Sequence, residues 1–312
     1  MKRLFLCLLV VIAVPVFAYN WYTWPGLNPF ENYDVEMRSA NYGWLCGYYG
    51  TIARWNGANW NLSPVPGLYP LYGISATDDS NAWCVGANGV ILHYNGATWD
   101  EVTPSPTTHN LWGIWVVDST HAYAVGENVM LKYNGSAWTS MAPSPGNFDW
   151  HGVWAGGPSS VWVAGGINGR ASYWNGVNWT AHNAGGGGTI YGLWFIDSTH
   201  GWASDDNGHL YHYEGGSGWS DVQQPVYTRL YSICFPHPTH GWCMGQDGVI
   251  LEFNGYLWVL KVQLPTFNSI FGVSLTSETD GFAVGANGMI LRVQSDDKVE
   301  STTLGNIRAL YK

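Results

Sequence analysis

An aromatic residue recurs seven times along the 312-residue chain at intervals of 39 or 40 residues, and this period constrains the fold more than any other feature. Most of these residues are followed by small or apolar residues and then by glycine, as in Trp83 to Gly86. A second series, of tryptophan alone, repeats about every 40 residues. The first series is Trp44, Trp83, Tyr123, Trp162, Trp202, Trp242 and Phe282, and the second is Trp21, Trp60, Trp99, Trp138, Trp179, Trp219 and Trp258. Self-similarity at such a period is typical of propellers and solenoids.

Each repeat contains four strand-like pieces. An apolar run such as residues 111–116 predicts the first strand, and Asp118 then caps a turn to the second. Asn-Gly pairs such as Asn88-Gly89 and Asn207-Gly208 follow the second strand and suit the positive φ angles of a type I′ hairpin. The third strand ends in an aromatic residue, and the fourth begins at the second-series tryptophan. Four short strands per repeat indicate a propeller blade; a β-solenoid, with shorter coils, is the alternative.

The chain is therefore predicted to be an all-β, seven-bladed β-propeller of four-stranded antiparallel blades. The last repeat has no tryptophan after Val293, whereas Trp21 lies 13 residues before Asp34, just as Trp60 lies 13 residues before Gly73. We expect residues 21–25 to supply the fourth strand of the last blade. The N-terminal strand would then close the ring and remove open sheet edges.

The first 18 residues have the pattern of a secretory signal peptide. Lys2 and Arg3 precede an apolar run over residues 4–16, which is short for a bilayer span, and Ala18 precedes the expected cleavage site. An uncleaved anchor is the alternative. The predicted organisation is a signal peptide at 1–18, a propeller at 19–293 and a charged tail at 294–312. We expect an exported protein (periplasmic, cell-surface or extracellular) with no membrane span after cleavage.

The composition limits the classes of partner and of chemistry. The chain has 12 Lys+Arg against 22 Asp+Glu, a net charge of −10, and only 11% charged residues. Nucleic acids and anionic membranes select basic surfaces, so neither is an expected partner. No nucleophile motif or recurring pair of carboxylates is present. We therefore expect a monomeric protein without a cofactor that is not an enzyme, although catalysis by scattered loop residues stays open.

The repeat unit also resembles a known family. Gly96-Ala97-Thr98-Trp99 resembles the end of the Asp-box (BNR) repeat, and residues 21–293 resemble secreted bacterial propellers of the photosystem II assembly-factor-like group. The resemblance implies the propeller fold and, for function, assembly of a membrane complex. The aspartate of the box is absent, with Tyr94 near its place, and no arginine cluster is present, which argues against a sialidase.

One position in each repeat, just before the first-strand glycine or its substitute, always carries an aromatic ring. In a propeller the first strands line the central channel, so we expect these rings near one mouth, where they could stack on sugars or cations. The alternative is packing between blades, and the same two interpretations apply to the second-series tryptophans. The candidate ring consists of Tyr33, Tyr72, Trp112, His151, Tyr191, Tyr231 and Phe271.

Two weaker candidate sites lie in blades five and six. Asp205, Asp206 and Asn207 cluster oxygen atoms that could hold Ca²⁺, the alternative being a solvated turn. Cys234 and Cys243 lie on neighbouring strands and form either a disulfide or two buried thiols. Cys46 and Cys84 belong to adjacent blades at positions offset by one residue, which argues against pairing.

The leading functional interpretation is an exported binding or scaffold propeller that engages a glycan or a protein partner through one face of the ring. The alternatives are a glycan-active hydrolase or lyase on a propeller scaffold, and an assembly factor for a membrane complex. Two carboxyl groups facing each other in the channel mouth would favour the hydrolase.

Overall fold

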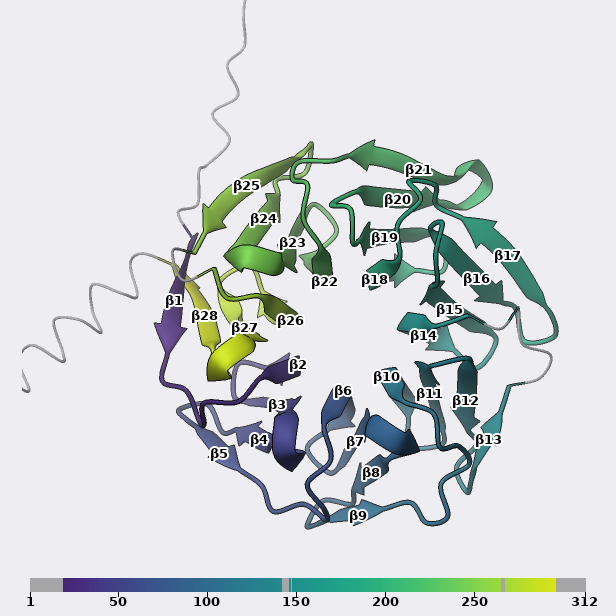
Figure 1. Cartoon of the computed structure of the whole chain (residues 1–312), viewed down its shortest axis with the longest axis vertical. Helices are drawn as coiled ribbons and strands as arrows, with labels where there is room; N and C mark the ends of the chain where they lie inside the picture. The colour runs from purple at the N-terminus through teal and green to yellow at the C-terminus, as the bar shows by residue number, and fades with distance from the viewer. Residues whose placement is uncertain (1–18, 142–145, 147, 265–266, 296–312) are drawn as a thin grey trace, which may run out of the picture.

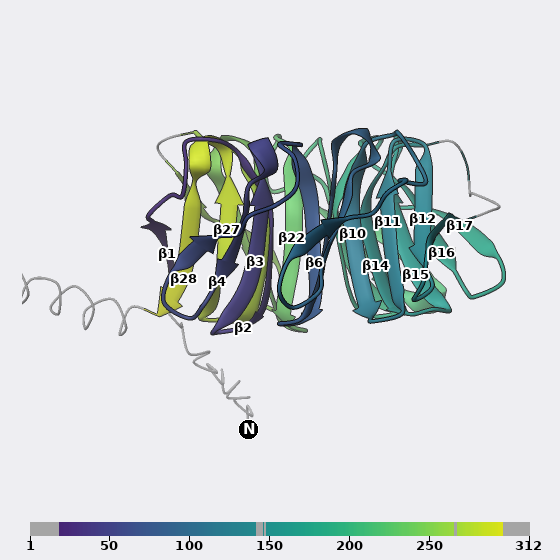
Figure 2. The same ribbon diagram turned by 90° about the horizontal axis from the view of Figure 1, so that it is seen from below.

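The computed structural model describes residues 19–141, 146, 148–264 and 267–295. Seven four-stranded antiparallel sheets stand around a central channel (Figure 1), and the ring is a short cylinder from the side (Figure 2). This confirms the predicted seven-bladed propeller. The predicted signal peptide (1–18) and residues 296–312 of the predicted tail lie outside the described residues.

The strands occupy four concentric positions. The innermost are β2 (Asn32–Ser39), β6 (Leu71–Asp78), β10 (Leu111–Asp118), β14 (Trp150–Gly157), β18 (Ile190–Asp197), β22 (Leu230–His237) and β26 (Ile270–Ser277). The second are β3 (Tyr42–Gly47), β7 (Asn81–Gly86), β11 (His121–Gly126), β15 (Ser160–Gly165), β19 (His200–Asp205), β23 (His240–Gly245) and β27 (Asp280–Gly285). The third are β4 (Ile52–Trp55), β8 (Ile91–Tyr94), β12 (Val129–Tyr133), β16 (Arg170–Trp174), β20 (Leu210–Glu214), β24 (Val249–Phe253) and β28 (Ile290–Ser295). The outermost are β5 (Trp60–Leu62), β9 (Trp99–Glu101), β13 (Trp138–Ser140), β17 (Trp179–Asn183), β21 (Gly218–Gln223), β25 (Trp258–Gln263) and β1 (Tyr19–Trp24).

Five single-turn 3-10 helices lie in the connections: η1 (Tyr48–Gly50), η2 (Ala87–Gly89), η3 (Gly215–Ser217), η4 (Gln246–Gly248) and η5 (Ala286–Gly288). In the second blade, φ is 56° at Asn88 and 74° at Gly89. Positive φ at two consecutive residues is the geometry of a type I′ hairpin, so the Asn-Gly interpretation is confirmed there. At the other end of the blades, the predicted capping turn is also present, because Asp118 Oδ1 accepts the N–H of Thr120 at 2.7 Å.

The N-terminal strand closes the ring, as predicted. β1 pairs antiparallel with β28 along its whole length, with Trp21 opposite Val293, and β28 continues through β27 to β26. β28 extends to Ser295, two residues beyond the predicted end of the propeller at 293. Because Tyr19 faces Ser295, both ends of the described ring lie on the same edge, opposite the hairpins between second and third strands (Figure 2).

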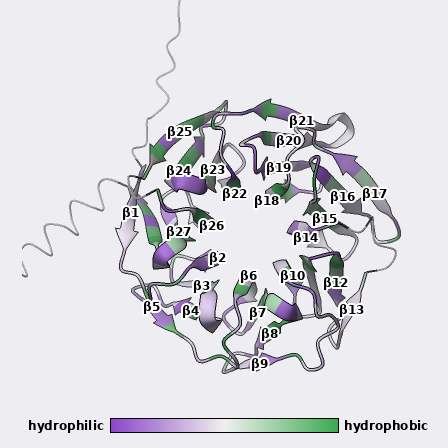
Figure 3. Ribbon diagram, viewed as in Figure 1, coloured by the Kyte–Doolittle hydropathy of each residue, from purple (hydrophilic) through white to green (hydrophobic). Residues whose placement is uncertain are grey.

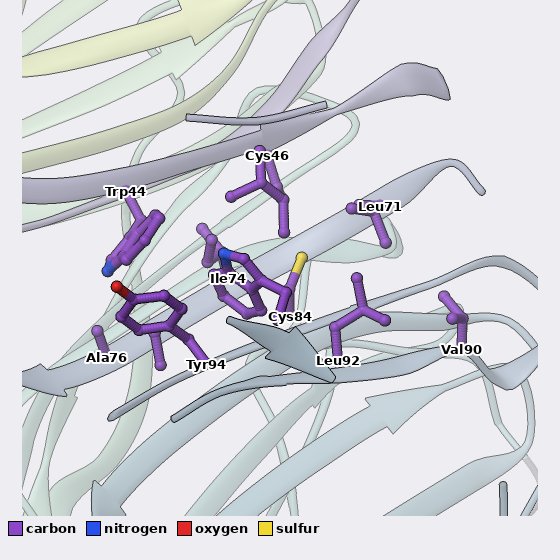
Figure 4. Packing of buried hydrophobic residues seen from close by; sticks show 12 residues of the cluster. Trp44, Cys46, Leu71, Ile74, Ala76, Cys84, Val90, Leu92 and Tyr94 are labelled. Carbon is purple, nitrogen blue, oxygen red and sulfur yellow. The ribbon is translucent and has the colours of Figure 1, made fainter. Parts of the chain in front are cut away.

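The hydrophobic core is divided into seven clusters, one at each junction between neighbouring blades. Figure 4 shows the junction of the first and second blades. In each cluster a second-series tryptophan packs against the first-series aromatic residue of the preceding blade; Trp138 meets Trp83 edge-on, with ring centroids 5.3 Å apart. Five of the seven second-series tryptophans expose 9% or less of their surface. For these five, packing is the interpretation that the structure confirms.

The disulfide candidate in the sixth blade is not formed. Cys234 and Cys243 are free thiols, and they lie on opposite faces of the sixth blade, Cys234 in the cluster shared with the seventh blade and Cys243 in the one shared with the fifth. Alternate residues of a strand face opposite sides of its sheet. Cys234 is paired with Trp242, the neighbour of Cys243, so the two thiols cannot meet. Of the two alternatives, the disulfide is wrong and two buried thiols are confirmed.

The same alternation brings Cys46 and Cys84 together. Both belong to the cluster between the first two blades, where the Cys84 side chain is hydrogen-bonded to Cys46. The one-residue offset between the repeats turns Cys46 toward the next blade and Cys84 toward the previous one. The offset therefore brings the two thiols into contact, but no disulfide joins them, as the sequence led us to expect. Both are free, buried thiols in this structure.

Within the described part of the chain, we find no helix with the length and apolar character needed to cross a membrane.

Candidate functional site

All seven residues of the predicted aromatic ring line the central channel. Each is the second residue of its innermost strand, and each is half-buried. They lie near the end of the channel formed by the second-to-third-strand hairpins, and we call this end the aromatic mouth. It consists of Tyr33, Tyr72, Trp112, His151, Tyr191, Tyr231 and Phe271.

The rings contact one another around the mouth. Trp112 stacks on His151 with centroids 4.5 Å apart, and His151 stacks on Tyr191 at 4.3 Å. The series continues from Tyr191 through Tyr231 to Phe271 and Tyr33, and ends at Tyr72. Neighbouring rings are either stacked, as at His151, or tilted and edge-on, and all seven residues remain partly exposed. The aromatic residues thus form one continuous, partly exposed surface.

Glycine brings the innermost strands close enough to form this narrow channel. A Cβ atom on Gly113 would lie 2.5 Å from the carbonyl oxygen of His151 in the next blade. No real Cβ tolerates that distance, so glycine is required for this approach. In the first blade Asp34 takes the same repeat position, and its Oδ2 accepts the N–H of Ile74 in the second blade at 3.0 Å.

Hydroxyl groups join other blades at the repeat position two residues after that of Asp34. Ser75 Oγ accepts the N–H of Val116 at 3.1 Å, and Ser274 Oγ accepts the N–H of Met37 at 2.9 Å. Each bond joins neighbouring blades directly beside the channel. The wall of the site is consequently made of rigid strands rather than mobile loops.

Two carboxylates that the repeat pattern did not predict also line the channel. Asp34 and Glu36 both belong to β2, the innermost strand of the first blade. Burial raises the pKa of each to about 7. Figure 3 shows β2 as largely hydrophilic, whereas β6 and β26 contain hydrophobic stretches. The sequence signal that could have identified Asp34 is a break in the repeat, since five other blades have glycine at this position and one has Ser232.

Tryptophan lines another part of the channel at the depth of Glu36. Trp115 and Trp194 occupy the Glu36 position in the third and fifth blades, with ring centroids 5.9 Å apart. The cavity they share with Glu36 has a volume of about 170 Å³. No lysine or arginine is among the described residues that line it. The channel thus combines an acidic wall with aromatic ones.

The rim of the mouth carries one basic group. The guanidinium of Arg229 lies over Tyr191 and Tyr231, 5.1 and 5.7 Å from their ring centroids, and 4.0 Å from Asp206.

Among the mouth residues, burial lowers the pKa of His151 to about 4 and raises that of Tyr33 to about 12. Both rings are therefore neutral near pH 7.

The carboxylates do not have the arrangement of a glycosidase. Such enzymes place two carboxyl groups on either side of the scissile bond. Asp34 and Glu36 lie two residues apart on one strand, so they share a wall of the channel. Asp34 also uses both oxygens to accept backbone N–H groups, of Val35 at 2.8 Å and of Ile74.

The calcium candidate in the fifth blade is a hydrogen-bonded turn. Asp205 is fully buried, and its Oδ1 accepts the N–H groups of Asn207 and His209, while its Oδ2 accepts the hydroxyl of Tyr211 at 2.6 Å. Asp206 Oδ1 accepts the N–H of Thr189. These donors occupy the oxygens, and the described residues contain no group of three or more acidic, histidine or cysteine side chains able to hold a metal. The structure thus agrees with the alternative of a turn, although Asp205 is buried in it rather than solvated. The type I′ prediction for Asn207-Gly208 is wrong, because only Gly208 has positive φ.

Comparison with solved structures identifies the fold. A YCF48 protein bound to D1 peptide matches with a TM-score of 0.72 and 16% identity, over 91% of this chain and 100% of that one. YCF48 from Cyanidioschyzon merolae matches with a TM-score of 0.69 and 16% identity, over 88% and 98%. The WD40 propeller domain of Doa1 matches with a TM-score of 0.77 and 12% identity, over 90% and 98%. No protein-family model and no curated protein matches the chain.

Proposed function

We propose that this chain is an exported, non-catalytic binding propeller that engages an exposed segment of a partner protein at the aromatic mouth. The observation that carries the proposal is the continuous series of half-buried rings around the channel entrance. A concave site lined by aromatic side chains together with a few polar groups is typical of a ligand-binding site.

The small volume of the cavity favours a polypeptide segment over a folded domain as the ligand. A cavity of about 170 Å³ holds a single side chain or a small molecule. The surrounding rings would contact the residues on either side of the one that enters. The scaffold is preorganised by the bonds between blades, so binding would not require ordering of the site.

The structural neighbours agree with this kind of partner. One solved propeller of the same fold is a YCF48 bound to D1 peptide, so the architecture is compatible with peptide binding. The repeats of this chain resemble those of photosystem II assembly factors, and a role in assembling a membrane complex would be one use of such binding. Export is proposed from the signal-peptide pattern of residues 1–18.

A glycan is the second candidate ligand, because the exposed rings of the mouth also suit stacking on sugars. Binding assays on the chain beginning at Tyr19 separate the two. We expect defined peptides from a displayed library to bind, and we expect Tyr72→Ala, in the mouth, to weaken that binding at least tenfold.

The matched control is Tyr256→Ala, because Tyr256 is 84% exposed in the turn between the third and fourth strands, at the other end of the ring. Peptide binding that survives Tyr72→Ala unchanged would overturn the proposed site. Binding on a glycan array alone, lost in Tyr72→Ala, would assign the mouth to a sugar.

A further inference from the structure

We infer that the channel beneath the aromatic mouth receives one basic side chain, a lysine or arginine, from the bound segment. This inference rests on the proposed function, whose ligand it specifies. It is carried by the combination of an acidic wall with aromatic walls in a cavity the size of one side chain.

The acidic wall comes from β2. Asp34 and Glu36 both line the cavity, and the Glu36 side chain is only 15% exposed. Each carboxylate oxygen can accept about two hydrogen bonds. The two oxygens of Asp34 each accept a backbone N–H, which fixes the group while leaving lone pairs for a further donor.

Two arginines near the cavity leave carboxylate oxygens of the acidic wall free to bind a ligand. Arg38 contacts Glu36 Oε1 at 3.2 Å from a side chain that is 44% exposed, which leaves Oε2 for another donor. Arg229 lies at the rim with Tyr191, Tyr231 and Asp206. Among the described residues, those that line the cavity carry negative charge without a lysine or arginine of their own.

The aromatic walls suit the same ligand. Trp115 and Trp194 line the cavity at the depth of Glu36, and the rings of the mouth lie above them. An ammonium or guanidinium group is attracted to the face of an aromatic ring, most strongly to tryptophan and more strongly when desolvated. The methylene groups of lysine or arginine would pass through the rings while the charge reaches the carboxylates.

The same walls disfavour other side chains. A glutamate or aspartate entering the cavity would meet two carboxylates, and like charges facing each other across an interface weaken binding. An apolar side chain would bury the remaining lone pairs of both carboxylates without supplying a donor for them. The channel is therefore selective for positive charge.

The test uses a matched peptide series with the chain beginning at Tyr19, at pH 8, where both carboxylates are mainly ionised. A capped pentapeptide with lysine flanked by glycines is compared by calorimetry with the same peptide carrying norleucine or glutamate. The butylammonium ion serves as the probe for the cavity alone. We expect the lysine peptide to bind at least tenfold more tightly than the norleucine peptide, and the glutamate peptide not to bind.

Glu36→Gln should reduce the affinity for the lysine peptide at least tenfold, whereas Glu214→Gln should not change it, because Glu214 lies on β20, away from the channel. The comparison of the peptides needs no variant and stands even if Glu36→Gln unfolds. Equal affinity for lysine and norleucine peptides would overturn the inference.

The two proposals fail in different ways. If a library-selected peptide binds at the mouth and replacing its basic residues by norleucine has no effect, the basic-side-chain inference is wrong while the peptide site stands. If neither the selected peptides nor butylammonium bind, both are wrong.

Discussion

The indole of Trp99 in the second blade stands edge-on against the indole of Trp44 in the first, with ring centroids 5.2 Å apart and planes at 82°. Trp21 meets Trp242 in the same way at 5.4 Å, and Trp258 meets Trp202 at 5.6 Å. Each blade therefore contributes one tryptophan to the junction before it and one aromatic residue to the junction after it. The two periodic series of the sequence are the two halves of one repeated contact.

Removing half of this contact should destabilise the ring. Trp99 is 5% exposed, and replacing a buried tryptophan by alanine typically costs about 3–5 kcal/mol. We expect Trp99→Ala to lower the free energy of unfolding by that amount in a urea titration. Tyr256→Ala, at an 84% exposed position, should change it by less than about 0.5 kcal/mol. Equal losses in the two variants would contradict the packing role of Trp99.

The repeated contacts explain why most of the fold could be predicted from the sequence. A residue required at every junction appears seven times at one period, and the hairpin glycines recur in the same way. The closing strand was predictable because Trp21 is the second-series tryptophan that the last repeat lacks. The aromatic mouth followed from the same logic, since its residues hold one repeat position on the channel-lining strands.

The acidic wall could not be predicted by that logic because it occurs once. Asp34 and Glu36 replace residues that are glycine, serine, cysteine or tryptophan in the other blades, so repetition gives them no signal. Their importance depends on the ring closing around them. Repeat positions alone did not predict which cysteines meet, because contact depends on the face of the sheet that each cysteine occupies.

Deleting the closing strand should weaken the whole ring. β1 makes the only pairing that covers the outer edge of β28 in the described structure, and Trp21 belongs to the core between the sixth and seventh blades. We expect a chain beginning at Gly26 to melt at a lower temperature than one beginning at Tyr19. Hydrogen exchange should show faster exchange of the β28 amides. An unchanged melting temperature would refute the closing role of β1.

Glu36 should make stability depend on pH. Burial raises its pKa from 4.5 to about 7 in the folded protein. Between these values the unfolded chain releases the proton while the folded chain keeps it, so the free energy of unfolding falls as pH rises. Below pH 4.5 the group is protonated in both states, and well above pH 7 it is ionised in both. The contribution of Glu36 to the free energy of unfolding is therefore constant within each of these two pH ranges.

Glu36→Gln removes this titration. We expect the free energy of unfolding of the variant, minus that of the unmodified chain, to increase from pH 4.5 to pH 7 by up to about 3 kcal/mol. Urea titrations at half-unit steps of pH measure the difference, and they cancel the carboxylates common to both chains. Glu214→Gln, at an exposed position on β20, is the control for replacing a carboxylate by an amide. A flat difference for Glu36→Gln would show that the carboxyl is not desolvated.

The four thiols of a chain beginning at Tyr19 should be unreactive in the folded protein. Cys46, Cys84, Cys234 and Cys243 are all free and completely buried. Burial raises the pKa of Cys234 and of Cys243 to about 12, and it raises that of Cys46 as well. Because the thiolate is the reactive form, we expect very slow reaction with an aromatic disulfide reagent at pH 8. In guanidinium chloride all four should react at once.

The same thiol titration tests which cysteines lie close enough to form a bond. Four reactive thiols in denaturant are expected for a sample kept reduced, whereas two would indicate a bond already formed. If an added disulfide oxidant does link a pair, peptide mapping should find Cys46 joined to Cys84, because these thiols meet at the junction of the first two blades. Cys234 and Cys243 face different junctions, so a bond between them requires the sixth blade to come apart. Detection of that bond in the folded protein would contradict the register of β22 with β23.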